Sequence, residues 1–286
     1  MPSSAEEIVE LLDLETIDLN LFRGIQPDTM LQRVFGGQVA AQALVAGART
    51  VEAPRLVHSL HSYFLRPGDP AVPIVYDVER IRDGKSFSTR RVVARQHGRP
   101  IYYMTLSCQI PEDGYDHQDR MPDVPTPAET PELGALLRKV RGEGAGAWLE
   151  EWASLELRWI GDSGRGGIPT SDDRPAEVRL WIRTNGSLGD DPLIHQAAFT
   201  YLSDLTLLGS ALVPHDVDLG SPHVQSASLD HTIWFHRPFR ADEWLLYDQT
   251  SPSASGARGL GIGRVFSEDG TLVATVAQEG LIRPRD

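Results

Sequence analysis

The pattern of hydrophobic and polar positions in the first half of the chain predicts a core helix followed by four strands. Within 6–22, apolar residues at helical spacing and then an alternating run predict a short helix and one strand. The run 34–46 opens with two glycines and continues with many alanines, which let a helix lie close against a sheet. Strands separated by turn residues are then expected at 57–65, 72–81, 86–96 and 101–110.

The same pattern returns in the second half of the chain. A long helix is expected at 192–212, where Pro192 suits the first helical turn. Four strands are expected after it, at 228–238, 244–250, 257–266 and 272–280. A helix with four strands therefore occurs twice, and this repetition indicates an internal duplication.

The middle of the chain separates the two repeats. Residues 111–131 contain five prolines and several acidic side chains, a composition typical of a linker. A helix is expected at 133–157, a loop at 161–175 and a strand at 178–182. The expected organisation is an N-terminal half at 1–112, a proline-rich linker with a helix at 113–176, and a C-terminal half at 177–286.

The strand expected at 228–238 is unusually polar, and a similar segment occurs in the first half of the chain. It carries Asp230 next to His231, and His61 stands at the matching place of the first repeat. Neighbouring residues of a regular strand point to opposite faces, so Asp230 and His231 cannot act together on one atom. We therefore expect His61 and His231 to be buried, hydrogen-bonded parts of the scaffold.

Composition narrows the class of protein. The single cysteine, Cys108, excludes an intramolecular disulfide framework and a thiolate zinc site, and no other metal-binding cluster is expected. The net charge of −13 without a Lys/Arg cluster argues against a nucleic-acid partner. There is no signal-peptide pattern and no run of 18 apolar residues, so a soluble, cytoplasmic protein without a membrane partner is expected.

Several segments together carry a resemblance to a known family. They are Arg33–Gln38, His58–Phe64, Asp83–Arg91, Leu229–Pro238, Ser253–Gly259 and Gln278–Gly280. The sequence resembles the acyl-CoA thioesterase II family in these segments, which span nearly the whole chain. The resemblance implies an α+β double hot-dog fold, with two antiparallel sheets each wrapped round a central helix. It also implies an acyl-CoA substrate without a further cofactor, and the fold favours a homo-oligomer, either a dimer or a tetramer.

The resemblance places a water-activating site in the second half. In the family, a carboxylate on the second helix, a hydroxyl at the start of the next strand and a glutamine on the last strand hold the attacking water. These positions fall on Asp204, Ser228 and Gln278 of this sequence. Ser228 stands where bacterial members carry threonine, which keeps the hydroxyl and removes a methyl group.

Further residues are candidates for binding the substrate. Backbone N–H groups of Gly36, Gly37 and Gln38, at the start of the first core helix, could face the oxyanion of a thioester. Arg90, Arg91 and Arg258 could meet the phosphates of coenzyme A, although isolated arginines usually lie on solvated faces.

Two other functions stay open on the sequence. One is an enoyl-CoA hydratase of the hot-dog type, which would need an aspartate–histidine pair on a helix. His195 lies nine residues before Asp204 and off its helical face. The other is a protein that binds or senses acyl-CoA without turnover, which the polar residues at all three expected positions do not exclude.

Overall fold

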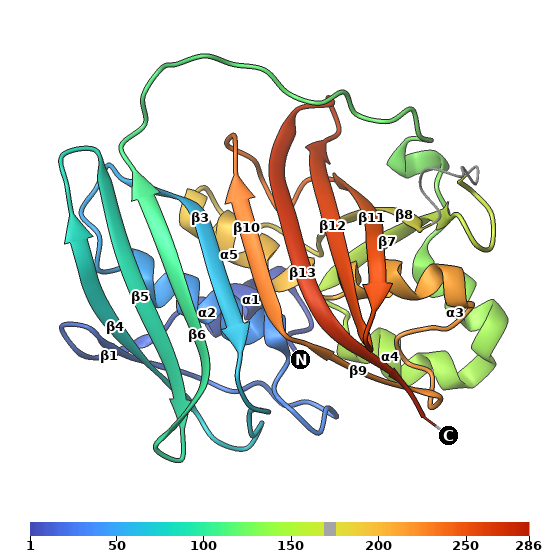
Figure 1. Ribbon diagram of the computed structural model, residues 1–286, viewed down its shortest axis with the longest axis horizontal. Helices are drawn as coiled ribbons and strands as arrows, with labels where there is room; N and C mark the ends of the chain where they lie inside the picture. The colour runs from blue at the N-terminus through green and yellow to red at the C-terminus, as the bar shows by residue number, and fades with distance from the viewer. Residues whose placement is uncertain (169–175, 286) are drawn as a thin grey trace.

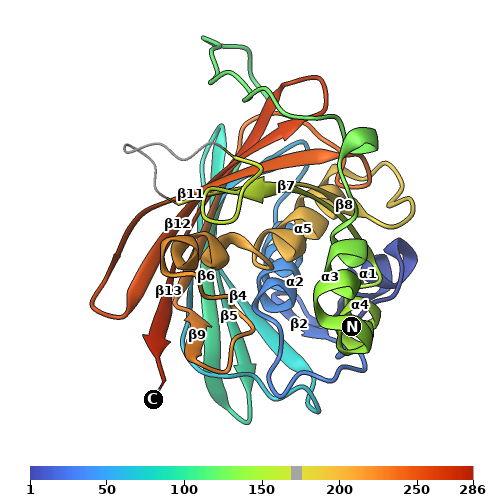
Figure 2. The same ribbon diagram turned by 90° about the vertical axis from the view of Figure 1, so that its right-hand side faces the viewer.

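Two core helices lie side by side against one face of a long antiparallel sheet (Figures 1 and 2). The computed structural model describes residues 1–168 and 176–285. The first half of the chain forms α1 (Ala5–Leu12), β1 (Glu15–Asp18), β2 (Leu21–Gly24), α2 (Gly36–Ala48), β3 (Leu56–Phe64), β4 (Ile74–Asp83), β5 (Phe87–Gln96) and β6 (Arg99–Gln109).

The rest of the chain repeats this order after a connecting segment. The connecting segment forms η1 (Pro127–Glu129), α3 (Leu133–Arg141), η2 (Gly142–Ala145), α4 (Gly146–Glu151) and β7 (Leu155–Asp162). The second half forms β8 (Glu177–Thr184), α5 (Pro192–Ser203), η3 (Leu207–His215), β9 (Val224–Ser228), β10 (Asp230–Phe235), β11 (Leu245–Ser255), β12 (Arg258–Ser267) and β13 (Leu272–Pro284).

The two repeats share one continuous sheet. Its order is β1-β2-β4-β5-β6-β3-β10-β13-β12-β11-β8-β7, and β9 pairs with β13 beside this path. The repeats meet where β3 and β10 pair antiparallel, with Leu60 opposite Ile233. The predicted double hot-dog architecture is thus confirmed, and the two expected sheets are the halves of one sheet that curves round α2 and α5 (Figure 2).

Small residues let the two core helices approach each other and the sheet. The alanines of α2 are buried, as their composition predicted, except for the last. A side chain at Gly37 would begin 2.3 Å from the carbonyl oxygen of Tyr201 in α5, and one at Gly47 would begin 2.3 Å from Leu106 Cδ2 in β6. At Gly37, where the neighbouring atom belongs to the backbone, only glycine allows this close approach.

The structure corrects the predicted length of the second core helix. The α-helix ends at Ser203 instead of continuing to 212, and a 3₁₀ segment follows from Leu207. Asp204 is therefore the C-cap residue of α5, not a mid-helix residue. Aspartate is a poor helix former, and here its carboxylate accepts hydrogen bonds from strands instead of lying along the helix surface.

Three other boundaries also differ from the predictions. The helix expected at 133–157 is interrupted after Arg141, where Gly142 takes a φ of 58°, and the chain is extended again from Leu155. The strand expected at 228–238 is divided into β9 and β10 at Leu229. The single strand expected within 6–22 is the short pair β1 and β2.

The connecting segment contributes more than a helix. It also supplies β7, which pairs with β8 at the edge of the second half. Of the loop expected at 161–175, residues 169–175 lie outside the described part of the chain. The run Pro192–His215 is long and apolar enough to span a membrane by composition, but it is mostly buried inside the sheet as α5 and η3.

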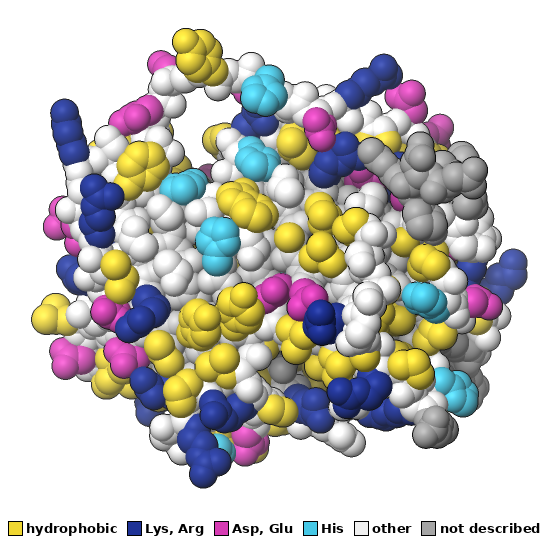
Figure 3. Space-filling view, in the orientation of Figure 1, with side chains coloured by type: hydrophobic (Ala, Val, Ile, Leu, Met, Phe, Trp, Pro, Cys, Tyr) yellow, Lys and Arg dark blue, Asp and Glu magenta, His cyan; other side chains and the backbone are white. Residues whose placement is uncertain are grey.

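The two histidines of the repeat have different environments, so the expectation for His61 was wrong. His231 is fully buried, and its Nε2 lies 2.8 Å from Ser203 Oγ. His61 is exposed and pairs across the sheet with Thr232, while its ring contacts Trp234 edge-on. Adjacent positions of the paired strands face opposite sides, so the two imidazoles lie on different faces. The outer face in Figure 3 accordingly shows histidine and apolar side chains near its centre.

Candidate active site

Three elements bring the predicted polar residues together at one end of the core helices. Asp204 follows α5, Ser228 ends β9, and Gln278 points inward from β13. Ser228 Oγ donates to Asp204 Oδ1 at 3.1 Å. Gln278 Nε2 donates to Ser228 Oγ at 2.8 Å and also to Asp204 Oδ1. The three side chains therefore form one closed hydrogen-bonded group.

The carboxylate of Asp204 has an unusual electrostatic environment. Burial raises the pKa of Asp204 to about 6, although hydrogen bonds from Gln278, from Ser228 and from the Gly37 N–H act in the opposite direction. Its two oxygens also differ. Oδ1 accepts from Ser228 and Gln278, whereas Oδ2 lies over Gly36, where a β-carbon would stand only 2.5 Å away. A carboxylate with a pKa near neutrality is suited to accept a proton.

The start of α2 reaches this group from the first half of the chain. Gly36 lies against both Asp204 and Phe64, and the Gly37 N–H donates to the Asp204 carboxylate. Gln38 is buried, and its side-chain amide donates to Gln26 Oε1 at 2.8 Å. The three predicted residues are thus near Asp204, but the Gly37 N–H is already engaged and the Gln38 side chain turns to its own half.

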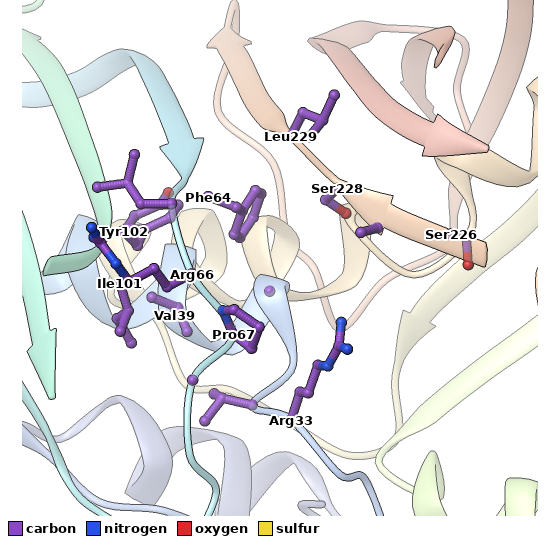
Figure 4. A pocket seen from close by; sticks show the side chains of 15 residues that line it. Arg33, Val39, Phe64, Arg66, Pro67, Ile101, Tyr102, Ser226, Ser228 and Leu229 are labelled. Carbon is purple, nitrogen blue, oxygen red and sulfur yellow. The ribbon is translucent and has the colours of Figure 1, made fainter. Parts of the chain in front are cut away.

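A pocket of about 330 Å³ opens beside this group (Figure 4). Ser228 and Gly36 both line it, so it reaches the hydrogen-bonded group at Ser228, whereas Asp204 and Gln278 are not among its lining residues. Its other walls are mostly apolar, with Val39, Phe64 and Ile101 among them. A pocket of this kind, apolar with a few convergent polar groups, is typical of a small-molecule site.

The structure does not bring the three predicted phosphate-binding arginines to this pocket. Arg91 and Arg258 are exposed and pair with Glu79 and Glu279 on the sheet. Arg90 is buried in the first half, where its guanidinium donates to Thr50, to Asp83 and to backbone carbonyls. Burial and a full set of partners leave Arg90 no surface for a ligand.

Arg90 is therefore expected to stabilise the fold without contacting substrate. Arg90→Met should lower the free energy of unfolding by about 2–4 kcal/mol, because buried acceptors lose charged hydrogen bonds. Thermal denaturation measures this loss, and the exposed change Arg91→Met should shift the midpoint by no more than about a degree. A raised KM for acyl-CoA with an unchanged melting midpoint would contradict this role for Arg90.

Two arginines that line the pocket were not among the candidates from the sequence. Arg33 precedes α2 by three residues, and Arg66 follows β3; both line the pocket. Arg33 stands in the same short segment as Gly36 and Gly37, so its proximity to the helix start was a usable signal. For Arg66 there was no such signal, because the sequence does not show that β3 ends at this pocket.

The histidines do not join the site as catalytic groups. Burial lowers the pKa of His231 to about 3, so its ring is neutral at physiological pH. His195 lies at the opposite end of α5 from Asp204, where its Nε2 is 2.9 Å from the Gly189 carbonyl and its Nδ1 accepts from the Ala241 N–H. In the described part of the chain, no three His, Cys, Asp or Glu side chains are grouped to hold a metal ion.

Comparison with known proteins identifies the family. The family model of the acyl-CoA thioesterase N-terminal domain matches residues 25–109. The family model described as acyl-CoA thioesterase matches residues 172–281. Acyl-CoA thioesterase 2 of Haemophilus influenzae is 40% identical over 99% of both chains. The chain belongs to the acyl-CoA thioesterase II family. The first matched segment lies within the N-terminal half, and the second covers most of the C-terminal half.

Relatives of this thioesterase extend to animals and to solved structures. Human acyl-coenzyme A thioesterase 8 is 40% identical over 96% of this chain and 88% of its own. The crystal structure of an acyl-CoA thioesterase II from Mycobacterium marinum superposes with a TM-score of 0.83, at 45% identity and 98% coverage of both chains. Membership of the thioesterase II family and the hot-dog fold, both expected from the sequence, are thus confirmed.

Proposed function

We propose that this thioesterase hydrolyses acyl-CoA to a free fatty acid and CoA, with a water activated by Asp204, Ser228 and Gln278. The observation that carries the proposal is the closed hydrogen-bonded group of these residues, which borders the pocket at Ser228. Membership of the thioesterase II family supports the reaction, and the geometry supports the roles of the residues.

The two oxygens of Asp204 have separate tasks in this proposal. Ser228 and Gln278 fix the carboxylate through Oδ1, which leaves Oδ2 to accept a proton from water on the pocket side. Gln278 Oε1 is buried without a protein partner among the described residues, so it can accept the second proton of that water as a hydrogen bond. The water oxygen would then attack the thioester carbon directly, without an acyl-enzyme. Collapse of the tetrahedral intermediate breaks the C–S bond, and the proton held by Asp204 passes to the CoA sulfur, which leaves as the thiol.

The start of α2 can stabilise the oxyanion. The first intrahelical bond runs from the Val39 N–H to the Phe35 carbonyl, so the N–H of Gly36 precedes the helical ladder. Gly36 lines the pocket, whereas the Gly37 N–H serves Asp204. We therefore assign the oxyanion donor to the Gly36 N–H. Donors fixed in this way stabilise the charge that develops on the carbonyl oxygen.

The decisive experiment is a thiol-release assay with purified protein and acyl-CoAs of graded chain length. We expect release of one equivalent of CoA per fatty acid. If the protein instead adds water to an enoyl-CoA, it is a hydratase; the engaged ring nitrogens of His195 speak against this outcome. If the protein binds acyl-CoA and releases no thiol at any chain length, it is a sensor.

The pKa of Asp204 predicts a pH dependence. The base must be ionised to accept a proton, and burial raises its pKa to about 6. We therefore expect kcat/KM to rise with pH through about 6 and to level off above about 7. Initial rates across pH 5–8 measure this profile. A profile that is flat between pH 5 and 7 would contradict the assignment of Asp204 as the base.

The cytoplasmic location and the homo-oligomeric state stay predictions.

A further inference from the structure

Two arginines make the pocket positively charged, although the protein as a whole is negatively charged. The protein has a net charge of −13, yet Arg33 and Arg66 line the pocket and no described Asp or Glu side chain does. The second pocket of the described chain differs in this respect, since Glu243, Glu268 and Asp269 accompany its arginines. A local positive surface at a pocket concentrates anionic ligands even on an acidic protein.

The guanidinium groups of these arginines are also available. Most arginines of the described chain are engaged in ion pairs, as Arg90, Arg91 and Arg258 are. Among the described residues, no carboxylate pairs with Arg33 or Arg66; Arg66 gives one N–H to the Pro100 carbonyl at 2.7 Å. Several N–H donors of each side chain therefore remain for a ligand.

The two side chains lie on different sides of the pocket. In Figure 4, Arg33 extends toward Ser226 and Ser228, whereas Arg66 lies on the side of Ile101 and Tyr102. Figure 3 shows Lys and Arg side chains gathered along the lower edge of the molecule, where β3 ends and β9 lies in Figure 1.

We infer that Arg33 and Arg66 bind phosphate groups of the coenzyme A part of the substrate, each a different group. This inference rests on the proposed function, because it places the thioester at Gly36 and Ser228. Coenzyme A carries a diphosphate and a ribose phosphate, and guanidinium groups bind phosphate oxygens through two parallel N–H donors. The arginines bind the coenzyme A part of the substrate, while the acyl group contacts the apolar walls of the pocket.

The test compares two substrates that differ only in the carrier. One is an acyl-CoA, and the other is the N-acetylcysteamine thioester of the same acid, which has no phosphate. We expect Arg33→Ala and Arg66→Ala each to raise KM for the acyl-CoA by about 10-fold or more, with KM and kcat for the short thioester changed by less than about twofold. Arg120→Ala, which removes an equal charge from the exposed linker, should leave both substrates unaffected.

Equilibrium binding of free CoA, measured by calorimetry, separates this inference from the proposed function. We expect CoA binding to weaken in both arginine variants and to depend less on salt than in the wild type. Equal losses on both substrates, or unchanged binding of CoA, would overturn the inference and leave the proposed hydrolysis intact. Weakened CoA binding in the arginine variants, together with a wild-type protein that binds CoA but releases no thiol, would support the inference and refute the hydrolysis.

Discussion

Asp204→Asn should lower kcat for acyl-CoA hydrolysis by about 10²–10⁴-fold, the usual contribution of a general base. An amide keeps the shape of the side chain but cannot accept the proton of the attacking water. Ser228→Ala and Gln278→Ala should have smaller effects, because each leaves the carboxylate in place and removes one of the groups that hold it. Single-turnover rates of thiol release measure the chemical step for all three variants.

Asp204→Asn should also stabilise the fold. A gain in stability together with a loss of activity distinguishes a catalytic role of Asp204 from a structural one. Burial raises the folded-state pKa of Asp204 to about 6 from an ordinary value of 3.8. The folded protein therefore binds the proton more tightly than the unfolded chain, and stability from this group is lost as pH rises through about 6. At pH 8 the ionised carboxylate costs on the order of 3 kcal/mol, a cost that asparagine does not carry.

Melting midpoints at two pH values measure this effect. Asp204→Asn should melt a few degrees above the wild type at pH 8, and the difference should vanish near pH 4, where Asp204 is protonated in the folded state. A variant that loses both activity and stability at pH 8 would show that Asp204 supports the fold through its hydrogen bonds. An active variant would remove Asp204 from the mechanism.

The sequence was sufficient for the architecture because its signals are local. Glycine and alanine in α2, and turn residues between alternating runs, determine where the helix and strands lie. The end of α5 was missed because Leu205, Leu207 and Leu208 continue the apolar composition past Ser203. At the end of the α-helix, the side chain of Asp204 is held by β9 and β13, a long-range pairing that no local pattern contains.

The arginines show again that long-range packing is not visible in the local sequence. Arg33 and Arg90 both stand in segments that resemble the family, and the sequence does not distinguish their roles. Arg90 faces inward because it lies on the buried face of β5, together with Ser88 and Val92. Its guanidinium donates a hydrogen bond to Thr50, which follows the end of α2. Arg33 faces the pocket because the loop before α2 passes β9 of the other half. Only the packing of the two repeats separates the structural arginine from the available one.

Two neighbouring glycines at the start of α2 should respond oppositely to the same substitution. A β-carbon at Gly36 would stand 2.5 Å from Asp204 Oδ2 and 2.8 Å from Phe64 Cε1, both of which are side-chain atoms that can move. Gly36→Ala should therefore displace the carboxylate from its productive place and lower kcat by about 10²-fold, since small misplacements at a reacting centre are costly. Its melting midpoint should change little, because alanine favours the helix.

Gly37→Ala is the matched control for this prediction. Its β-carbon would stand 2.3 Å from the carbonyl oxygen of Tyr201, which belongs to the backbone of α5 and cannot turn away. The two core helices must then separate, and overpacking of this kind typically costs about 1–3 kcal/mol. Gly37→Ala should therefore melt several degrees below the wild type, whereas Gly36→Ala should fold normally and fail in the thiol-release assay. If Gly36→Ala retains full activity, then Asp204 Oδ2 does not need the space over Gly36, and the assignment of this oxygen as the proton acceptor is wrong.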